Sequence, residues 1–433
     1  MATTESCTTW ALLHAATAGD SMAAFSFCRF CGARLEDTFV DLGESPLCEK
    51  YVAPHQLKEP DRYYPLHAWI CRQCLLVQLE AIVPPEEIFS EYAYFSSYSD
   101  SWVSHARAYA DTAIQRFNLG KDSRIVEIAS NDGYLLQHFA ARGFNVLGIE
   151  PAANVAKVAE NRGIPTQVLY FGLDTARDLR DRVGRADLLI GNNVLAHVPD
   201  LNDFVTGMEE LLAPDGVITM EFPHLLRLIE QSQFDTIYHE HFSYFMLLTA
   251  ERIFDAHHLR IFDVEELATH GGSLRIYAEH AERDPDRMTG RVAQLLDRER
   301  SGGYDRIEQY AGFSDRVKAV KRSLLEFLTR AKAEGRRVAG YGAPGKGNTL
   351  LNHCGIGSDL LEYTVDRNPY KQGLYTPGMR IPIRHPERIT ETRPDYLLIL
   401  PWNLKDEIME QMAHIRQWGG RFVVPIPGLQ VFD

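Results

Sequence analysis

The chain has 433 residues, enough for about three domains of ordinary size. With 45% hydrophobic and 24% charged residues it has the composition of a folded globular protein, which excludes a disordered or fibrous chain. The formal net charge of −14 argues against a nucleic-acid binder, because binding to phosphates favours a surplus of Lys and Arg. No run of about 18 uncharged apolar residues predicts a membrane span, and the opening residues do not resemble a signal peptide, so we expect a cytoplasmic protein.

Two Cys-x-x-Cys pairs, Cys28/Cys31 and Cys71/Cys74, lie in a small module that we expect over residues 27–90, after an extension over 1–26. Together they can supply four thiolates to one tetrahedral Zn²⁺. A redox dithiol or a chance pairing is the alternative, but two pairs of identical spacing favour zinc. A four-sulfur site has no open coordination position, so the zinc would be structural.

An aromatic and hydroxyl-rich segment follows the cysteine module. Its Tyr94 and Tyr98 either grip a ligand (cofactor or sugar) or pack between domains. From residue 124 strands and helices alternate, which predicts a parallel sheet in a domain over 91–280. A charged helical stretch over 281–334 predicts a bridging helix pair, and a second alternating region predicts another Rossmann-like domain over 335–433. The predicted fold class is therefore α/β, with two Rossmann-like domains behind a small zinc module.

The strand at 124–129 is followed by a turn that resembles the acidic-x-Gly-x-Gly-x-Gly turn of S-adenosylmethionine (SAM)-dependent methyltransferases. Such a turn presents backbone amides and a helix N-terminus to a ligand. Two of the expected glycines are Ala129 and Asn131, so the turn alone also fits a dinucleotide-binding domain. Glu150, at the end of the next strand, can bind both ribose hydroxyls and favours SAM. The residues that we expect to contact SAM in this domain are Glu127, Asn131, Gly133, Glu150, Asn192, Asn193 and His197.

The densest group of titratable side chains lies in the stretch Tyr238-His239-Glu240-His241. A histidine beside a carboxylate and a phenol provides a base, an orienting partner and a hydrogen-bond donor, which favours acid–base catalysis. In an extended strand His239 and His241 share one face, unless a turn breaks the alternation. A His-x-His metal pair and a packed structural cluster are the alternatives.

Cationic side chains occur in two later turns. Arg275 follows the turn His270-Gly-Gly-Ser and either lines the same pocket or belongs to a hairpin. Lys346 and Asn348 lie in a glycine-rich turn after a strand, where backbone amides could face a diphosphate and Lys346 would supply charge. The spacing is not that of a phosphate-binding loop, and a vestigial turn that only packs is the alternative.

These motifs occur in the order found in the nucleotide-sugar C-methyltransferases of deoxysugar and natural-product biosynthesis, and the chain resembles that family from residue 27 to its end. The resemblance implies an N-terminal zinc module, a central SAM-dependent methyltransferase domain and a C-terminal Rossmann-like domain. It implies a dTDP-linked 4-keto-deoxyhexose as substrate, methylated at the carbon beside the ketone. It also implies that Tyr238, Glu240 and His241 form the active centre.

On this hypothesis His241 removes the proton next to the ketone, directly or through Tyr238, while Glu240 orients His241. Tyr238 or a histidine stabilises the enolate oxygen, and the enolate attacks the methyl group of SAM. The residues that we expect to contact the substrate are His239, Arg275, Lys346 and Asn348. The rival functions are methyl transfer to another enolisable metabolite, methylation of nucleic acid, and an inactive scaffold. We expect a monomer with no nucleic-acid or membrane partner.

Overall fold

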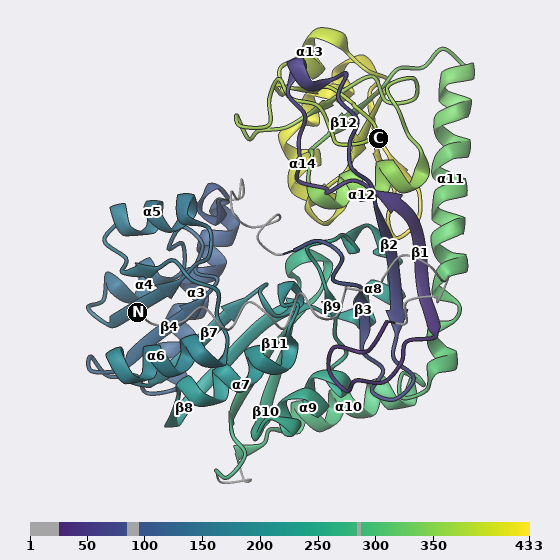
Figure 1. Cartoon of the computed structure of the whole chain (residues 1–433). Coiled ribbons are helices and arrows are strands. Elements are labelled where there is room, and N and C mark those ends of the chain that lie inside the picture. Colours follow the sequence, from purple (N-terminus) through teal and green to yellow (C-terminus); the bar gives the residue numbers. More distant parts are fainter. Residues whose placement is uncertain (1–25, 85–94, 284–286) are drawn as a thin grey trace.

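Three β-sheets organise the chain in the computed structural model, which describes residues 26–84, 95–283 and 287–433 (Figure 1). The sheets belong to the N-terminal module, the middle domain and the C-terminal domain. Tyr94 and residues 1–25 of the expected extension lie outside the described residues. Within the described ranges, no helix has both the length and the apolar character needed to cross a membrane.

The N-terminal sheet is antiparallel and recruits a strand from the middle of the chain. Its strands, in spatial order, are β1 (Asp37–Ser45), β2 (Tyr64–Ile70), β3 (Val77–Leu79) and β9 (Ser243–Tyr244). Val77 pairs with Tyr244 and Gln78 with Ser243. The backbone N–H of Leu79 also donates to the carbonyl of Phe242 at 3.0 Å. The module therefore holds the segment that directly follows Tyr238–His241.

The middle sheet has seven strands in the order β10–β11–β8–β7–β4–β5–β6, and the last five of these are parallel. Apolar runs such as Leu188–Ile190 are buried on both faces, as strands of a covered parallel sheet are. The strands are β4 (Arg124–Ile128), β5 (Asn145–Ile149), β6 (Thr166–Gln167), β7 (Ala186–Asn192), β8 (Leu212–Pro223), β10 (Leu259–Leu267) and β11 (Ser273–His280). The helices are α3 (Asp100–Arg116), α4 (Leu136–Ala140), α5 (Ala153–Asn161), α6 (Leu173–Val183), α7 (Leu201–Leu211), α8 (Leu225–Glu230) and α9 (Leu247–Ala256).

The C-terminal sheet has six strands in the order β14–β13–β12–β15–β16–β17, all parallel except β17. Its first strand in sequence, β12, lies between β13 and β15, so the turn after β12 is a switch point, where ligands bind in sheets of this kind. The elements are β12 (Val338–Tyr341), α12 (Gly345–Cys354), β13 (Thr364–Val365), β14 (Ile383–Arg384), α13 (Arg388–Thr392), β15 (Tyr396–Ile399), α14 (Lys405–Gln411), β16 (Arg421–Val424) and β17 (Gln430–Phe432).

Two helices, α10 (Gly290–Ser301) and α11 (Phe313–Ala333), connect the middle and C-terminal sheets; α10 lies beside α9, and α11 runs along one side of the molecule (Figure 1). The apolar face of α11 covers β1, and the Phe313 ring stacks on that of Phe39 with a centroid distance of 4.5 Å. In α10 the buried Glu299 accepts the backbone N–H groups of Leu247 and Leu248 at the start of α9. The charged stretch thus forms two helices, of which α11 packs against both β1 of the module and α12 of the C-terminal domain.

Candidate active site

Four cysteine sulfurs converge in the N-terminal module. The Sγ atoms of Cys28, Cys31, Cys71 and Cys74 lie within 4.8 Å of one another. A tetrahedral zinc ion with Zn–S bonds of about 2.3 Å needs sulfurs about 3.8 Å apart, so the four sulfurs fit around one ion. The side-chain amide of Gln78 on β3 donates to Cys28 Sγ at 3.2 Å and ties the cluster to the sheet. The prediction of a structural four-thiolate site is confirmed.

The turn after β4 has the left-handed backbone of a glycine-rich turn without all of its glycines. Ala129 (φ 56°), Asn131 (φ 49°) and Gly133 (φ 78°) all adopt a conformation that glycine takes freely. Asn131 stabilises the turn, because its Oδ1 accepts the backbone N–H of Ser96 at 2.8 Å. Space at Gly133 is also tight, since a Cβ there would lie 3.1 Å from Cγ1 of Ile164.

Ala129→Gly is expected to raise the stability of the middle domain by about 0.5–1 kcal/mol. A left-handed alanine costs roughly 1–2 kcal/mol, and the added freedom of the unfolded chain offsets part of the gain. The measurement is the midpoint of urea unfolding. Asn131→Gly is the matched control and should give no gain, because it loses the bond to Ser96. A lower midpoint for Ala129→Gly would contradict the strain argument.

Two buried carboxylates lie where β4 and β5 end. Glu150 accepts the backbone N–H groups of Asn131 at 3.0 Å and Ala152 at 2.9 Å. Neither carboxylate oxygen of Glu127 has a partner among the described residues, and burial with the nearby Glu150 and Asp132 holds the pKa of Glu127 well above its usual range. A ligand with cationic and hydroxyl groups would relieve this cluster. SAM carries an ammonium, a sulfonium and two ribose hydroxyls, so the residues present fit it.

The other predicted cofactor residues separate into two places. Asn192 ends β7 with its buried Oδ1 unpartnered among the described residues, and Asn193 contacts Nε2 of His270 at 3.3 Å. These two lie on the side of the turn after β4. His197, in the 3₁₀ helix η3 (Leu195–His197), instead contacts the ring of His241 with a centroid distance of 4.7 Å. His197 therefore belongs to the predicted catalytic group.

Tyr98 lies at the boundary between two domains. It belongs to the 3₁₀ helix η2 (Ser96–Tyr98), is 64% exposed, and its ring lies 6.4 Å from that of Tyr370 in the C-terminal domain. Adjacent to it, the backbone of Ser96 bonds to the turn at Asn131. The Tyr98 ring thus lies near the C-terminal domain, and a contact of Tyr98 with cofactor or sugar stays a prediction.

His241 lies in a cluster of rings. Its ring centroid is 4.0 Å from that of Tyr238 and 4.7 Å from that of His197. Its Nδ1 donates to the backbone carbonyl of Thr236 at 2.8 Å, which leaves Nε2 as the nitrogen with a free lone pair. Burial, reinforced by His197, holds the pKa of His241 well below its usual range, so the imidazole is neutral at pH 7. The carbonyl of Thr236 thus orients His241.

His239 points away from His241, which corrects the expectation that the two share a face. The backbone N–H of His241 donates to the carbonyl of Tyr238 at 2.8 Å, and this turn breaks the alternation of an extended strand. Nε2 of His239 donates to the carbonyl of Pro65 on β2 at 3.2 Å, and burial lowers the pKa of His239. His239 therefore anchors the segment to the N-terminal module, and the two rings do not form a metal pair.

Arg275 forms a buried ion pair instead of the predicted substrate contact. Its guanidinium donates to Glu221 at 2.5 Å and lies 3.0 Å from Nε2 of His105 and over the ring of Tyr109. Glu221 also accepts the hydroxyl of Thr269 at 2.9 Å. A carboxylate buried at the end of β8 needs a cation, and Arg275 supplies it. Through the bond from Thr269 to Glu221, this network stabilises the turn that carries His270.

Lys346 lies in the first turn of α12 and is connected to the segment before Tyr238. Its Nζ donates to Oδ1 of Asn403 at 2.7 Å and lies 5.0 Å from the centroid of the Trp402 ring. The indole N–H of Trp402 in turn donates to Asp235 at 2.7 Å. Asp235 belongs to the 3₁₀ helix η4 (Phe234–Thr236), which packs against α12.

An arm of the N-terminal module reaches between the two other domains. Sγ of Cys48 lies 3.8 Å from Oε1 of Glu240, and the carbonyl of Cys48 accepts the side-chain amide of Asn348 at 2.6 Å. The predicted substrate residue Asn348 thus joins the module to α12. Cys48, Asp235 and Trp402 belong to no recognisable motif, so no signal in the sequence pointed to their place in the site.

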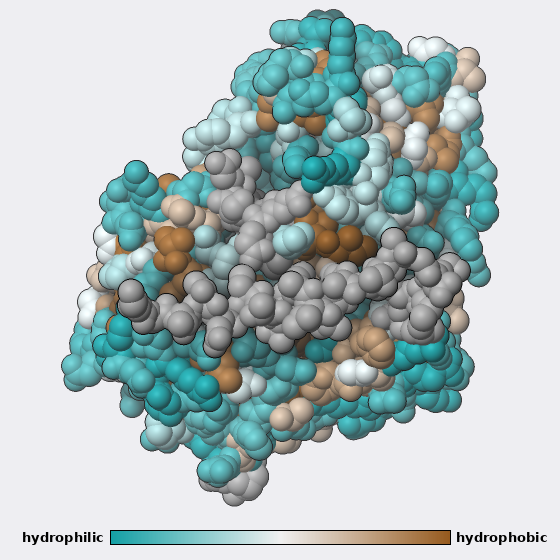
Figure 2. Space-filling model, in the orientation of Figure 1, coloured by the Kyte–Doolittle hydropathy of each residue, from teal (hydrophilic) through white to brown (hydrophobic). Residues whose placement is uncertain are grey.

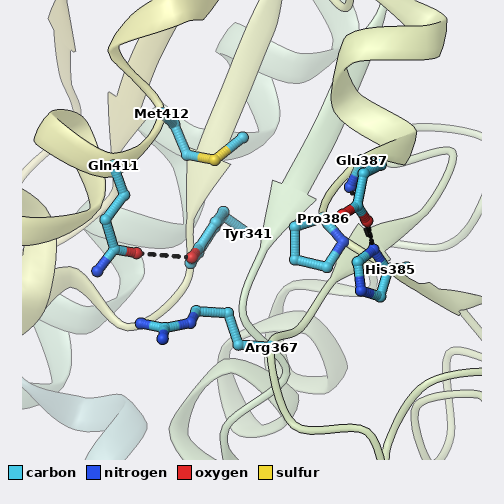
Figure 3. A pocket seen from close by; sticks show the side chains of 7 residues that line it. All are labelled: Tyr341, Arg367, His385, Pro386, Glu387, Gln411 and Met412. Carbon is cyan, nitrogen blue, oxygen red and sulfur yellow. Dashed lines mark hydrogen bonds and ion pairs between the residues drawn. The ribbon is translucent and has the colours of Figure 1, made fainter. Parts of the chain in front are cut away.

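A separate cavity of about 500 Å³ lies in the C-terminal domain (Figure 3). It opens where β12, β13 and β14 end, and the hydroxyl of Tyr341 donates to Gln411 at 3.0 Å inside it. Arg367 supplies a cation, and His385 pairs with Glu387 on the opposite side. None of the predicted site residues lines this cavity. The space-filling view shows a further hollow between the upper and lower parts of the molecule, with hydrophobic surface exposed in it (Figure 2).

Comparison with known proteins identifies all three parts. Family models match at residues 28–89 (zinc-binding domain), 102–264 (methyltransferase domain) and 268–427 (C-methyltransferase C-terminal domain). C-methyltransferase NovU of Streptomyces niveus is 38% identical over 406 residues, which are 94% of this chain and 96% of that protein. A ubiquinone biosynthesis O-methyltransferase of Chelativorans sp. (strain BNC1) is 28% identical over 96 residues, 22% of this chain and 38% of that protein.

Among solved structures, a SAM-dependent methyltransferase from Clostridium acetobutylicum ATCC 824 aligns with a TM-score of 0.33 and 12% identity, covering 41% of this chain and 92% of that one. The magnesium protoporphyrin IX methyltransferase of Synechocystis PCC 6803 with bound SAM aligns with a TM-score of 0.31 and 15% identity. The alignment covers 45% of this chain and 88% of that one. The match to NovU extends over nearly the whole of both chains. The protein therefore belongs to the family of C-methyltransferases with an N-terminal zinc module, and it is a SAM-dependent C-methyltransferase.

Proposed function

We propose that the enzyme methylates the carbon next to the ketone, C3, of a dTDP-linked 4-keto-deoxyhexose through an enolate. The observation that carries the proposal is the state of His241, a neutral imidazole whose Nδ1–H is held by Thr236 and whose Nε2 is free to accept a proton. A carbon becomes nucleophilic only when the proton next to a carbonyl is removed, so a C-methyltransferase acting on a ketone needs such a base. The bound SAM supplies the electrophilic methyl group.

The residues around His241 complete the proposed roles. Tyr238, with its ring against His241, either relays the proton or donates a hydrogen bond to the sugar. His197 packs edge-on against His241 and has a pKa lowered to about 4 by burial, so it too is neutral and able to bind a hydroxyl. Glu240 is buried and lies next to Cys48 in the arm of the module. We assign it the role of binding the substrate. The net charge of −14 supports a small acceptor over nucleic acid.

Mass spectrometry of a panel of dTDP-4-keto-deoxyhexoses, incubated with the enzyme and SAM, tests the proposal. We expect one member to gain one methylene, and its NMR spectrum to place the new methyl group on the carbon next to the ketone. A methyl group found on oxygen or nitrogen would overturn the enolate route. Methylation of a non-sugar ketone, with none of the sugars modified, would replace the acceptor and keep the chemistry.

A further inference from the structure

The turn that leads into α12 offers little room for an anion. The backbone N–H of Ala343 donates to Asp366 at 2.8 Å. At the first residue of the helix, a Cβ on Gly345 would lie 2.9 Å from Sγ of Cys48 and 3.1 Å from a carboxylate oxygen of Glu49. A carboxylate of the module therefore already lies at the helix N-terminus, where the helix dipole favours negative charge. A diphosphate at this place would meet Glu49, so Lys346 needs another assignment.

The side chain of Lys346 points toward the catalytic segments. It contacts Asn403 and the Trp402 ring. Trp402 in turn contacts the segment before Tyr238 and the turn at His270. The indole N–H reaches Asp235, three residues before Tyr238. The far edge of the same ring packs on the residue after His270, since a Cβ on Gly271 would lie 2.5 Å from it.

Charges around Lys346 agree with this position. Burial lowers the pKa of Lys346, and Asp235 acts in the opposite direction. Burial raises the pKa of Asp235 to about 7, which Lys346 partly offsets, and Oδ1 of Asp235 is buried without a partner among the described residues. The Lys346 charge also contributes to the lowered pKa values of His241 and His270. The groups that interact electrostatically with Lys346 thus lie on η4 (Asp235), on η5 (Thr269–Gly271, with His270) and in the 238–241 segment (His241).

We propose that Lys346 donates a hydrogen bond to the ketone oxygen of the sugar and stabilises the enolate, and that Asp235 positions Lys346 through Trp402. The inference rests on the proposed function. When Nε2 of His241 takes the proton from carbon, the electron pair of the C–H bond moves into the new C=C bond, and that of the C=O π bond moves to oxygen beside the Lys346 ammonium. No bond to Lys346 forms or breaks.

This assignment resolves a difficulty of the site. A histidine kept neutral by burial is a weak base, so the proton that it removes must be made more acidic. A fixed ammonium next to the carbonyl oxygen does this, because it is worth most where the negative charge develops. When Asp235 is ionised, it favours the protonated form of Lys346.

The test is Lys346→Met, which keeps the length of the side chain and removes its charge. With the sugar that the wild-type enzyme methylates, we expect the rate of solvent-deuterium exchange next to the ketone and kcat for methyl transfer to fall together by about 10²–10³-fold. The dissociation constant for dTDP alone, measured by calorimetry, should stay within about twofold, since the diphosphate is not its partner. Lys332→Met, which removes a surface pair with Asp359, is the matched control and should change neither quantity.

A rise of tenfold or more in the dTDP dissociation constant, with exchange at saturating sugar retained, would place Lys346 on the diphosphate and overturn the inference. Loss of both exchange and dTDP binding would also overturn it, because Lys346 would then support the whole site. Failure of the wild-type enzyme to methylate any sugar would count against the proposed function instead. The two failures are therefore distinguishable.

Asp235→Asn tests the positioning role through pH. The amide can still accept the Trp402 N–H, but it removes the negative charge that raises the pKa of Lys346. We expect the alkaline limb of the kcat profile, where Lys346 loses its proton, to move to lower pH than in the wild-type enzyme. A merely structural Asp235 would lower kcat without moving that limb, and this result would remove Asp235 from the proposal.

Discussion

His241→Asn is expected to lower the rate of solvent-deuterium exchange next to the ketone, and with it kcat, by about 10²–10⁴-fold, the usual contribution of a general base. Asparagine keeps a polar side chain near the carbonyl of Thr236 but has no nitrogen that can accept a proton. Exchange is followed by NMR of the sugar in D₂O, so the proton-removal step is observed separately from methyl transfer. Unchanged exchange would remove His241 from the role of base.

His239→Asn is the matched control, because it makes the same substitution two residues away. His239 binds the carbonyl of Pro65 and points toward the module, so its replacement should affect exchange far less. The pH profile gives a second readout. Burial lowers the pKa of His241, and a base must be unprotonated, so the acid limb of kcat/KM for the wild-type enzyme should lie below the ordinary histidine pKa of about 6.5.

Cys71→Ser is expected to abolish both zinc binding and methyl transfer, although the cysteine cluster does not take part in the chemistry. The free energy of zinc binding to such sites is also folding free energy, so a module that loses one thiolate should lose its fold. Strand β3 would then no longer pair with β9, and the segment at Tyr238–His241 would lose its support. Elemental analysis, together with the activity assay, measures the effect.

Cys354→Ser provides the control for a buried thiol outside the cluster. Cys354 ends α12, and this variant should retain one zinc ion per chain. Wild-type protein with substoichiometric zinc and full activity would contradict the structural role. So would a Cys71→Ser variant that methylates its substrate at the wild-type rate.

The sequence was most informative where chemistry is local. Two cysteine pairs of equal spacing predicted the metal cluster, and apolar runs separated by helical stretches predicted both α/β sheets. The joining of β9 to the N-terminal sheet could not be predicted, because it depends on contacts such as Val77 with Tyr244, far apart in the chain. A strand of two residues also carries no periodicity of its own.

In the site, the types of residue were predicted better than the directions in which their side chains point. Ala129 and Asn131 looked like departures from a glycine-rich turn, yet both adopt its left-handed backbone. The turn at His241 places His239 on the side opposite to His241. Glu221 is buried in a mostly apolar strand and forms an ion pair with Arg275. Such outcomes depend on which buried charge finds which partner, and this information lies in the folded structure rather than in spacing.

Because β9 belongs to the sheet of the zinc module, binding of the metal and binding of the methyl acceptor should be coupled. Whatever free energy the acceptor gains from an ordered reaction segment, by linkage the ion must gain as well, so the two should tighten each other's binding by the same factor. Low zinc concentrations would then lower the rate of methyl transfer while the other two domains stayed folded. Excising the catalytic domain to study it alone would discard the sheet edge on which its reactive segment rests.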